Sequence, residues 1–334
     1  MTGISASSAD RLHVVAAVIR RTDGAILLSH RPTHVEQGGL WEFPGGKLHA
    51  DETRVQGLAR ELREELGIGI TRATPLLTIP HDYPTRRVLL DVFVVDAWQG
   101  EAEGREGQRI CWVMPDALGS YAFPAANLPI VTAARLPRVY VVTPEPARDE
   151  ARFLAGLDAC LARGARLVQL RAPALAAVDY RALAQRVLRA CREHGAKLLL
   201  NAEPALCVAL GADGVHLNAR RLRACTSRPV THEYLLSASC HDAGELAMAQ
   251  RVGVDLALLS PVLPTATHPG AATLGWRGLA TLAAAAPLPV YALGGLGPSD
   301  LRHAIDAGCV GIAGIGQLWG GDAPLNDEAL LAGL

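Results

Sequence analysis

The stretch GKLHADETRVQGLARELREELGI, residues 46–68, decides the fold of the N-terminal part of the chain. It fits the spacing G-x5-E-x7-R-E-U-x-E-E-x-G-U, in which U is a bulky apolar residue, at every specified position. The periodicity predicts a helix over residues 53–66, on which Glu61, Glu64 and Glu65 stand at positions i, i+3 and i+4 of one stripe. Like charges at that spacing repel one another, so the stripe predicts a bound cation that compensates them.

The residues around this helix favour a metal site over a merely solvated acidic face. Carboxylate oxygens in a small cluster suit Mg²⁺ or Mn²⁺, ions that also bind phosphates. Gly45 allows a sharp loop whose backbone carbonyl can join the metal shell, and Arg60 can orient a carboxylate from the flank. A solvated helix face is the alternative interpretation, but it does not explain the glycines, Glu52 and Arg60.

The pattern resembles the Nudix box, and the resemblance covers residues 12–135. The segments WEFPGGK (41–47) and FPAAN (123–127) are similar to those of MutT-type 8-oxo-dGTP diphosphatases. The resemblance implies an α+β Nudix fold and Mg²⁺- or Mn²⁺-dependent cleavage of a nucleoside triphosphate into a monophosphate and pyrophosphate. The implied metal ligands are Gly45, Glu61, Glu64, Glu65 and Glu106, and either Glu61 or Glu106 is the candidate general base. The implied substrate contacts are Arg31, Phe43, Tyr83, Arg86 and Asn127.

Asn127 has the chemistry to recognise an oxidised purine. Oxidation at C8 turns guanine N7 from an acceptor into an N–H donor, and an asparagine amide can accept that hydrogen while donating to O6. Ordinary guanine would leave these polar groups unpaired, which supports strong discrimination. The alternative interpretation of Asn127 is a turn residue before a proline. Trp41 and Tyr83 differ in shape from the residues of the family, which leaves the exact nucleobase open.

The composition is typical of a soluble globular protein. The formal net charge is −1 and 50% of the residues are hydrophobic, so no charge excess indicates a nucleic-acid polymer as partner. Seven cysteines lie singly without a C-x-x-C pair, which predicts a reducing cytoplasm and neither disulfides nor a zinc site. The apolar run at residues 14–19 is too short to span a membrane. We therefore expect a cytoplasmic protein that acts on a small molecule.

A length of 334 residues predicts two domains, which we place at residues 1–135 and 138–334 with a short packed linker at 128–137. In the first domain, strands are expected at residues 12–20, 25–29 and 87–97. In the second, apolar strands are expected at residues 139–143, 167–171, 197–201, 214–217, 235–238, 256–260, 290–293 and 311–313. Eight strands that alternate with helices predict a (β/α)8 barrel of the TIM type.

The second domain resembles thiamine phosphate synthase and the related TenI-type thiazole tautomerase over residues 138–318. The matching segments are YVVT (140–143), VQLR (168–171), GADGVHL (211–217), SPVLPTAT (260–267) and ALGG (292–295). The resemblance implies a phosphate site at the carboxyl ends of the barrel strands, made by Gln169, Arg171, Asn201, Thr265, Thr267, Gly294 and Gly295. Where the synthase has lysines and acidic metal ligands, this chain has Pro173, Ala202, Arg221 and His268.

These substitutions leave three interpretations of the barrel open. It is a phosphate-binding module that has lost synthase activity, a working synthase or tautomerase with rearranged ligands, or a non-catalytic sensor or scaffold for the first domain. If the second interpretation holds, the first domain could hydrolyse a thiamine-related pyrophosphate. The loss of two metal-binding carboxylates beside retained phosphate donors favours the third interpretation, a non-catalytic sensor or scaffold, in the form of a degenerate barrel that still binds phosphate. The glycines also fit simple turns, and His216 is expected to pack within the barrel.

Overall fold

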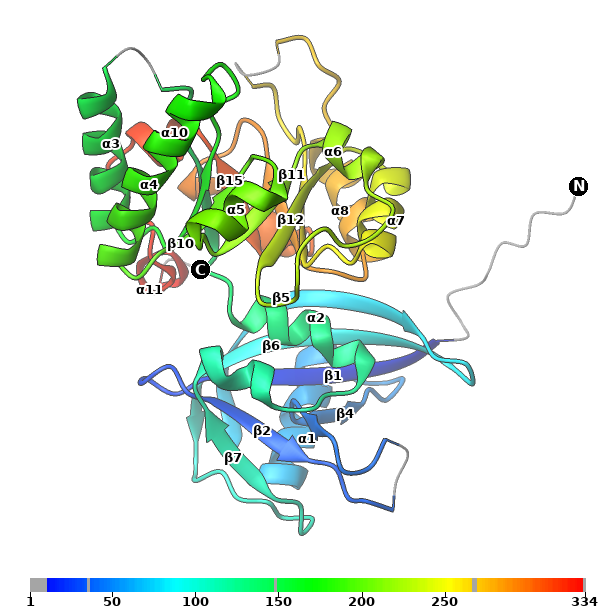
Figure 1. Ribbon diagram of the computed structural model, residues 1–334. Coiled ribbons are helices and arrows are strands. Elements are labelled where there is room, and N and C mark those ends of the chain that lie inside the picture. The colour runs from blue at the N-terminus through cyan, green and yellow to red at the C-terminus, as the bar shows by residue number, and fades with distance from the viewer. Residues whose placement is uncertain (1–10, 35–36, 147–148, 266–268, 333–334) are drawn as a thin grey trace, which may run out of the picture. The chain divides into compact units, whose positions relative to one another are not determined.

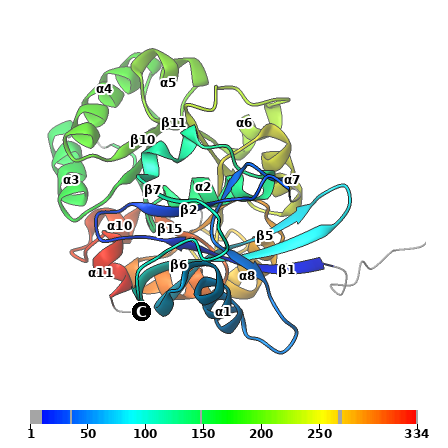
Figure 2. The ribbon, with the colours of Figure 1, turned by 90° about the horizontal axis from the view of Figure 1, so that it is seen from below.

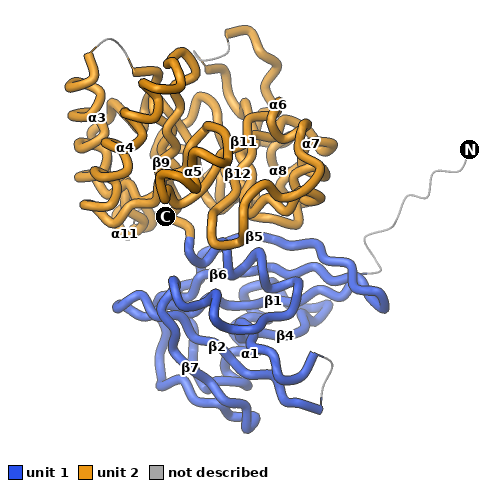
Figure 3. Tube along the Cα trace, viewed as in Figure 1, with its two compact units in different colours: residues 1–135 blue, residues 136–334 orange. Residues whose placement is uncertain are grey.

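The computed structural model describes residues 11–34, 37–146, 149–265 and 269–332. It divides into two compact units, Met1–Arg135 and Leu136–Leu334 (Figure 3). Two residues named above, Thr267 and His268, lie outside the described residues. Among the described residues, no helix is long and apolar enough to cross a membrane.

The first unit is an α+β structure built on two sheets (Figure 1). The larger sheet has the order β4 (Gly45–Lys47), β1 (Arg11–Ile19), β6 (Arg87–Gln99) and β5 (Gly69–Asp82), and only β1 and β6 pair in parallel. The smaller sheet has the order β3 (Trp41–Glu42), β2 (Ile26–His30) and β7 (Ile110–Val113). The unit also contains helices α1 (Arg54–Leu66) and α2 (Leu128–Ala134) and the 3-10 helices η2 (Pro115–Ser120) and η3 (Ala125–Asn127).

Helix α1 has a defined start, a defined end and one buried face. Thr53 caps its start by accepting the Gln56 N–H at 3.3 Å, and Gly67 ends it in the left-handed region with φ 71°. Leu58, Leu62 and Leu66 are fully buried in the core of the unit. These leucines stand four residues apart on one face of α1, and the acidic stripe borders that face, with Glu61 and Glu65 half-buried and Glu64 exposed.

Two segments of the first unit differ from the sequence-based expectation. Residues 128–134 form helix α2 and are not a linker, because Pro129 sits in the first turn, where a helix tolerates it. Strand β5 was not expected, because Pro75 and Pro80 interrupt its apolar alternation. The strand tolerates them since it lies at the edge of the sheet and its pairing register shifts between Pro75 and Leu77.

The second unit is a closed barrel of parallel strands, which confirms the predicted fold. The strands are β8 (Val139–Val142), β9 (Leu167–Leu170), β10 (Lys197–Leu200), β11 (Gly214–Leu217), β12 (Leu235–Cys240), β13 (Leu256–Leu259), β14 (Val290–Leu293) and β15 (Gly311–Gly314). The helices are α3 (Glu150–Ala162), α4 (Ala177–Glu193), α5 (Pro204–Leu210), α6 (Ala219–Ala224), α7 (Ala243–Val252), α8 (Gly275–Ala285), α9 (Leu301–Asp306), α10 (Gly316–Gly320) and α11 (Asp327–Leu331), with η4 (Pro298–Asp300) before α9. Helices of this unit surround the strands in the view of Figure 2.

Alternate residues of the barrel strands face two different environments. Val168 and Leu170 of β9 and Leu198 and Leu200 of β10 belong to the hydrophobic cluster that includes the buried residues of the surrounding helices. Side chains of a strand alternate between its two faces, so the residues between these, such as Gln169, face the barrel interior. The carboxyl ends of all eight strands therefore form one mouth of the barrel, where sites of this fold are built.

Candidate functional site

Strand β4 carries two glycines against which the acidic face of α1 packs. Glu65 Oε2 accepts the Gly45 N–H at 3.2 Å. The Glu61 carboxylate lies directly against Gly46, since a Cβ at position 46 would be 2.3 Å from Glu61 Oε2. At position 45, φ is 146° and a Cβ would lie 2.1 Å from Val15 O, so glycine is required. The two glycines allow two carboxylates of α1 to approach the neighbouring strand closely.

Arg60 organises the carboxylates on the flank of α1. Its guanidinium donates to both oxygens of Glu52, at 2.6 and 2.9 Å, and to Lys47 O at 2.9 Å. It also donates to Glu61 at 2.8 Å and to Glu64 at 3.2 Å. The hydrogen bond from Arg60 lowers the pKa of Glu52 to about 2. Arg60 thus holds Glu52 in its ionised form and ties Glu61 and Glu64 to the same guanidinium beside β4.

Glu106 lies on a loop that is tied to the end of α1. The Glu106 N–H donates to Gln108 Oε1 at 2.8 Å, and Gln108 Nε2 donates to Glu65 O at 2.9 Å. The Arg105 N–H donates to the same carbonyl at 2.9 Å. Burial raises the pKa of Glu65 to about 8, the Gly45 N–H opposes the shift, and the nearby charges of Glu42, Glu106 and Glu61 add to it. Glu106 is therefore close enough to Glu65 for its charge to contribute to the raised pKa of Glu65.

Asn127 is buried next to the segment that leads into β4. Only 9% of its surface is exposed, and its Oδ1 lies 3.5 Å from the Phe43 N–H, at the outer limit for a hydrogen bond. The Phe43 ring stacks on Phe123 with a centroid distance of 5.6 Å and an interplanar angle of 14°. The rings of Phe43 and Phe123 and the Asn127 amide therefore lie together. Phe43 stands two residues before Gly45, the glycine that contacts Glu65. The stacking partner Phe123 was not recognised from the sequence, although it stands in the FPAAN segment that carries Asn127.

Arg31 forms an ion pair with Glu42, and both side chains are one quarter exposed. Burial raises the pKa of Glu42, and the Arg31 guanidinium opposes the shift. Glu42 was missed as a candidate site residue, although its place between Trp41 and Phe43 in the WEFPGGK segment was a usable signal. The structure thus places the predicted phosphate contact Arg31 directly after β2, whose partner strand β3 leads into Phe43.

Tyr83 and Arg86 lie together at the turn between β5 and β6. The Tyr83 N–H donates to Arg86 O at 2.8 Å, and the Arg86 guanidinium lies 5.8 Å from the centre of the Tyr83 ring. The His81 ring meets the Tyr83 ring edge-on at 4.4 Å between centroids. These contacts hold Tyr83, Arg86 and His81 together at the turn. That this turn closes over a bound base stays a prediction.

The barrel residues expected to bind phosphate lie at or next to the mouth. Gln169 is in β9, and Arg171 and Asn201 directly follow β9 and β10. The Asn201 N–H donates to Leu170 O at 3.1 Å, which places Asn201 beside the end of β9. The Arg171 N–H donates to Thr143 Oγ1 at 3.0 Å, and its guanidinium lies 3.8 Å from Glu145.

The two glycines after β14 have a packing reason of their own. Gly294 and Gly295 have φ of 108° and 71°, and a Cβ would lie 2.9 Å from Pro261 Cα and 2.5 Å from Pro264 O, respectively. Thr265 ends the described part of that neighbouring loop. The close approach of this loop explains both glycines, and their role towards phosphate stays a prediction.

His216 is buried in the barrel interior, as its predicted packing role requires. Its Nδ1 lies 2.8 Å from Ser237 Oγ and its Nε2 lies 2.9 Å from Ser239 Oγ. Burial lowers the pKa of His216 to about 3, so the ring is neutral at physiological pH.

Comparison with known proteins now identifies both units. The NUDIX domain family matches residues 15–133, and the thiamine monophosphate synthase family matches residues 139–318. The 8-oxo-dGTP diphosphatase of Proteus vulgaris is 43% identical over 97 residues, which are 29% of this chain and 87% of that protein. This chain is a member of both families. It carries an N-terminal Nudix unit of the MutT type and a C-terminal thiamine phosphate synthase-like barrel.

Two further relatives show how far the likeness extends. The CTP pyrophosphohydrolase of Escherichia coli is 39% identical over 122 residues, covering 36% of this chain and 90% of that protein. The thiamine-phosphate synthase of Thioalkalivibrio sulfidiphilus is 32% identical over 206 residues, covering 61% of this chain and 97% of that protein. The relatives of the Nudix unit thus include pyrophosphohydrolases with two different named substrates, both nucleoside triphosphates.

The donor chemistry of the Nudix unit fits a divalent cation, although its ligands are not gathered in this arrangement. Within the described ranges, no three acidic, histidine or cysteine side chains converge as a ready-made metal cage. The Arg60 guanidinium engages Glu61 and Glu64 in this arrangement. Glu65 is buried near three other carboxylates, an arrangement that a hard divalent cation would relieve. Glu61, in its place beside Gly46, and Glu64 would each exchange an Arg60 contact for the cation to complete such a site.

Proposed function

We propose that the Nudix unit hydrolyses 8-oxo-dGTP to 8-oxo-dGMP and pyrophosphate with Mg²⁺ or Mn²⁺. The observation that carries the proposal is the segment before β4, where Phe43 contacts Asn127 and, two residues later, Gly45 contacts Glu65. Two residues of extended chain span about 7 Å. One nucleotide could therefore reach both Asn127, which suits an oxidised purine, and Glu65, whose carboxylate suits the phosphate end.

The residues of α1 and the loop after β6 would supply the chemistry at the phosphates. Glu61, Glu64, Glu65 and Glu106, with the backbone of Gly45, are the proposed ligands of the cation. When bound, the cation neutralises phosphate charge and activates water. Arg60 keeps Glu52 ionised and, before the cation binds, would hold Glu61 in its place beside Gly46. Glu61 and Glu106 are the two candidates for the group that takes the proton from the attacking water.

At the other end of the substrate, Phe43 and Asn127 would hold the base. The Asn127 amide, already buried, would accept the N7–H of the oxidised purine and donate to O6. Unmodified guanine offers an acceptor at N7, so two acceptors would face each other in a buried site. The stacked rings of Phe43 and Phe123 would form an apolar wall for the base. Arg31 is the proposed contact to a phosphate oxygen, and Tyr83 and Arg86 are proposed to close over the base.

Asn127→Ala tests the recognition of the base separately from the chemistry. We expect the ratio of kcat/KM for 8-oxo-dGTP to that for dGTP to fall by about 100-fold or more, since a polar site discriminates through its paired groups. Glu64→Gln is the matched control, because it should lower kcat/KM for both nucleotides and leave their ratio unchanged. Equal losses for both nucleotides in Asn127→Ala would contradict the proposed recognition.

A second candidate substrate is CTP, because the Escherichia coli relative named above is a CTP pyrophosphohydrolase. Measuring CTP beside 8-oxo-dGTP decides between them. Pyrophosphates of thiamine metabolism are the remaining alternative, suggested by the second unit of the chain. Turnover of a thiamine-related pyrophosphate in preference to both nucleotides would favour that alternative.

For the barrel, we propose a phosphate-binding module without synthase activity. Support comes from the positions at which the synthase resemblance implies lysine or acidic residues. Pro173 is exposed, Ala202 is buried, and Arg221 engages Asn201. Neither Ala202 nor Arg221, which stand at the two acidic positions, can ligate a metal through its side chain. We expect the barrel to bind phosphate but to form no thiamine phosphate from its two phosphorylated precursors.

A further inference from the structure

The loop that carries Glu106 is attached to the end of α1 by backbone hydrogen bonds. The Glu103 N–H donates to Leu66 O at 3.1 Å, and the Arg105 N–H donates to Glu65 O at 2.9 Å. Both carbonyls belong to the last turn of α1, and the last four carbonyls of a helix have no partner within it. The loop therefore binds to carbonyls that the helix leaves free, up to the residue before Glu106.

The Gln108 side chain adds a bridge between Glu106 and Glu65. Its Oε1 accepts the Glu106 N–H at 2.8 Å, and its Nε2 donates to Glu65 O at 2.9 Å. A glutamine amide carries an acceptor and a donor group side by side, so one side chain can make both bonds. Gln108 is half-buried, whereas Glu106 is exposed. One amide thus joins two residues that are proposed ligands of the same cation.

Two glycines let the loop turn back tightly enough for this bridge. A Cβ at position 104 would lie 2.1 Å from Gln108 O, a backbone atom that cannot move aside easily. Gly107, which separates Glu106 from Gln108, has φ of 79°, in the left-handed region that favours glycine. The turn returns Gln108 towards the residues before it, where its side chain reaches both the Glu106 N–H and the end of α1.

The bridge holds carboxylates together that repel one another without a cation. Burial raises the pKa of Glu65 to about 8, and the charge of Glu106 is among those that add to the shift. A loop that was free to move would relieve this repulsion by carrying Glu106 away from Glu65. The hydrogen bonds of the loop oppose that movement, and a bound divalent cation would remove its cause.

We propose that Gln108 is a positioning residue that holds Glu106 beside Glu65, so that both carboxylates meet the same divalent cation. The inference deepens the function proposed above and rests on the cation named there. Gln108 acts through Glu106, because its own amide is occupied by the two hydrogen bonds. A side chain that orients a metal ligand typically contributes about 10- to 100-fold to the metal affinity.

Titration of the full chain with Mn²⁺ alone, followed by electron paramagnetic resonance of the free ion, tests the inference without a nucleotide. Gln108→Met removes both hydrogen bonds and keeps the length of the side chain, and we expect it to raise the Kd for Mn²⁺ about tenfold. In a Glu106→Gln background the same replacement should change Kd by less than about twofold, because the ligand that Gln108 positions is already lost. Gln108→Asn, whose amide is one methylene too short for both bonds, should also weaken binding.

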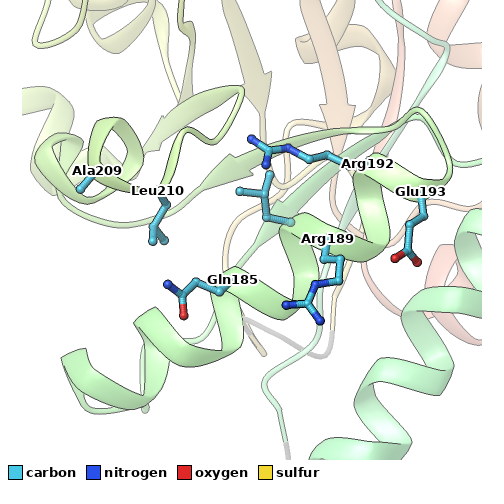
Figure 4. Close-up of a pocket in the computed structure, with 7 residues that line it drawn as sticks. Gln185, Arg189, Arg192, Glu193, Ala209 and Leu210 are labelled. Atoms are coloured by element: carbon cyan, nitrogen blue, oxygen red, sulfur yellow. The ribbon is translucent and has the colours of Figure 1, made fainter.

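Two other glutamines provide matched controls for the replacement by methionine. Gln99 is exposed at the end of β6 in the same unit. Gln185 lines an open groove of about 500 Å³ between α4 and α5 of the second unit, together with Leu210 (Figure 4). Gln99→Met and Gln185→Met should both bind Mn²⁺ as the parent chain does. Circular dichroism of each variant checks that the chain remains folded.

Two results would overturn the inference and leave the proposed substrate untouched. If Gln108→Met weakens Mn²⁺ binding by the same factor with and without Glu106, Gln108 supports the end of α1 and does not position Glu106. If folded Gln108→Met binds Mn²⁺ as tightly as the parent, the bridge has no role in holding the cation.

Two further results separate the inference from the proposed function. A parent chain that shows the expected coupling between Gln108 and Glu106 but hydrolyses neither 8-oxo-dGTP nor CTP would support the positioning role and contradict the proposed function. A parent chain that binds no Mn²⁺ would remove the cation site and with it both proposals.

Discussion

Replacing Gly46 by alanine should inactivate the Nudix unit without unfolding it. A Cβ at position 46 would lie 2.3 Å from Glu61 Oε2, whereas ordinary contacts begin at 3.4 Å. The carboxylate must therefore retreat by about 1 Å, and a misplacement of that size can cost about 100-fold in rate. The clashing atoms are the far end of a flexible side chain and not backbone, so the strand itself can remain in place.

Steady-state release of pyrophosphate from 8-oxo-dGTP in saturating Mg²⁺ measures this effect. We expect kcat/KM of Gly46→Ala to fall about 100-fold, equivalent to about 2.7 kcal/mol of transition-state stabilisation. Gly69→Ala is the matched control, because a Cβ at position 69 would meet nothing within 4 Å. It should keep parental activity. A folded Gly46→Ala protein with activity within threefold of the parent would show that Glu61 does not work from its place beside Gly46.

Two further predictions concern the stability of each unit. Leu58→Ala should lower the free energy of unfolding by about 2 to 5 kcal/mol, because Leu58 is fully buried. Val55→Ala, at a position 46% exposed in the same helix, should change it by less than about 0.5 kcal/mol. Equal effects of the two variants in urea unfolding would contradict the assigned core. His216 has a pKa lowered from 6.5 to about 3 by burial, so the unfolded chain binds its proton first and the free energy of unfolding falls as pH drops below about 6.5. Between pH 6.5 and 5, urea unfolding should show a loss about 1.5 kcal/mol larger for the parent than for His216→Asn, and identical losses would refute a neutral buried ring.

Local spacing made helix α1 and the barrel predictable from the sequence. The helix was expected at residues 53–66 and is observed as Arg54–Leu66 with Thr53 as its cap, because its capping residues and leucine periodicity are contiguous in the chain. All eight barrel strands occur at the expected places, since a buried parallel strand is a short apolar run bounded by loops. Arg60 also contacts Glu61 and Glu64 from the flank of the helix, and its role in orienting them for a cation stays a prediction.

Features that depend on tertiary contacts were not accessible from the sequence. The pairing of Arg31 with Glu42 and the stacking of Phe43 on Phe123 join segments whose proximity only the fold creates. Helix α2 was mistaken for a linker because prolines near both ends of residues 128–137 suggested a boundary, whereas burial of Ile130 and neighbouring residues ties the segment to the first unit. A local pattern cannot distinguish a proline that starts a helix from one that ends a domain.

The most direct test of the central claim compares hydrolysis of 8-oxo-dGTP and dGTP by the whole chain in Mg²⁺, with Glu64→Gln as the control, by following pyrophosphate release. The account predicts a strong preference for the oxidised nucleotide, and loss of turnover of both nucleotides in Glu64→Gln. Little turnover of either nucleotide by a folded, metal-binding protein would contradict the proposed substrate. Comparable rates for both nucleotides would contradict the role assigned to Asn127.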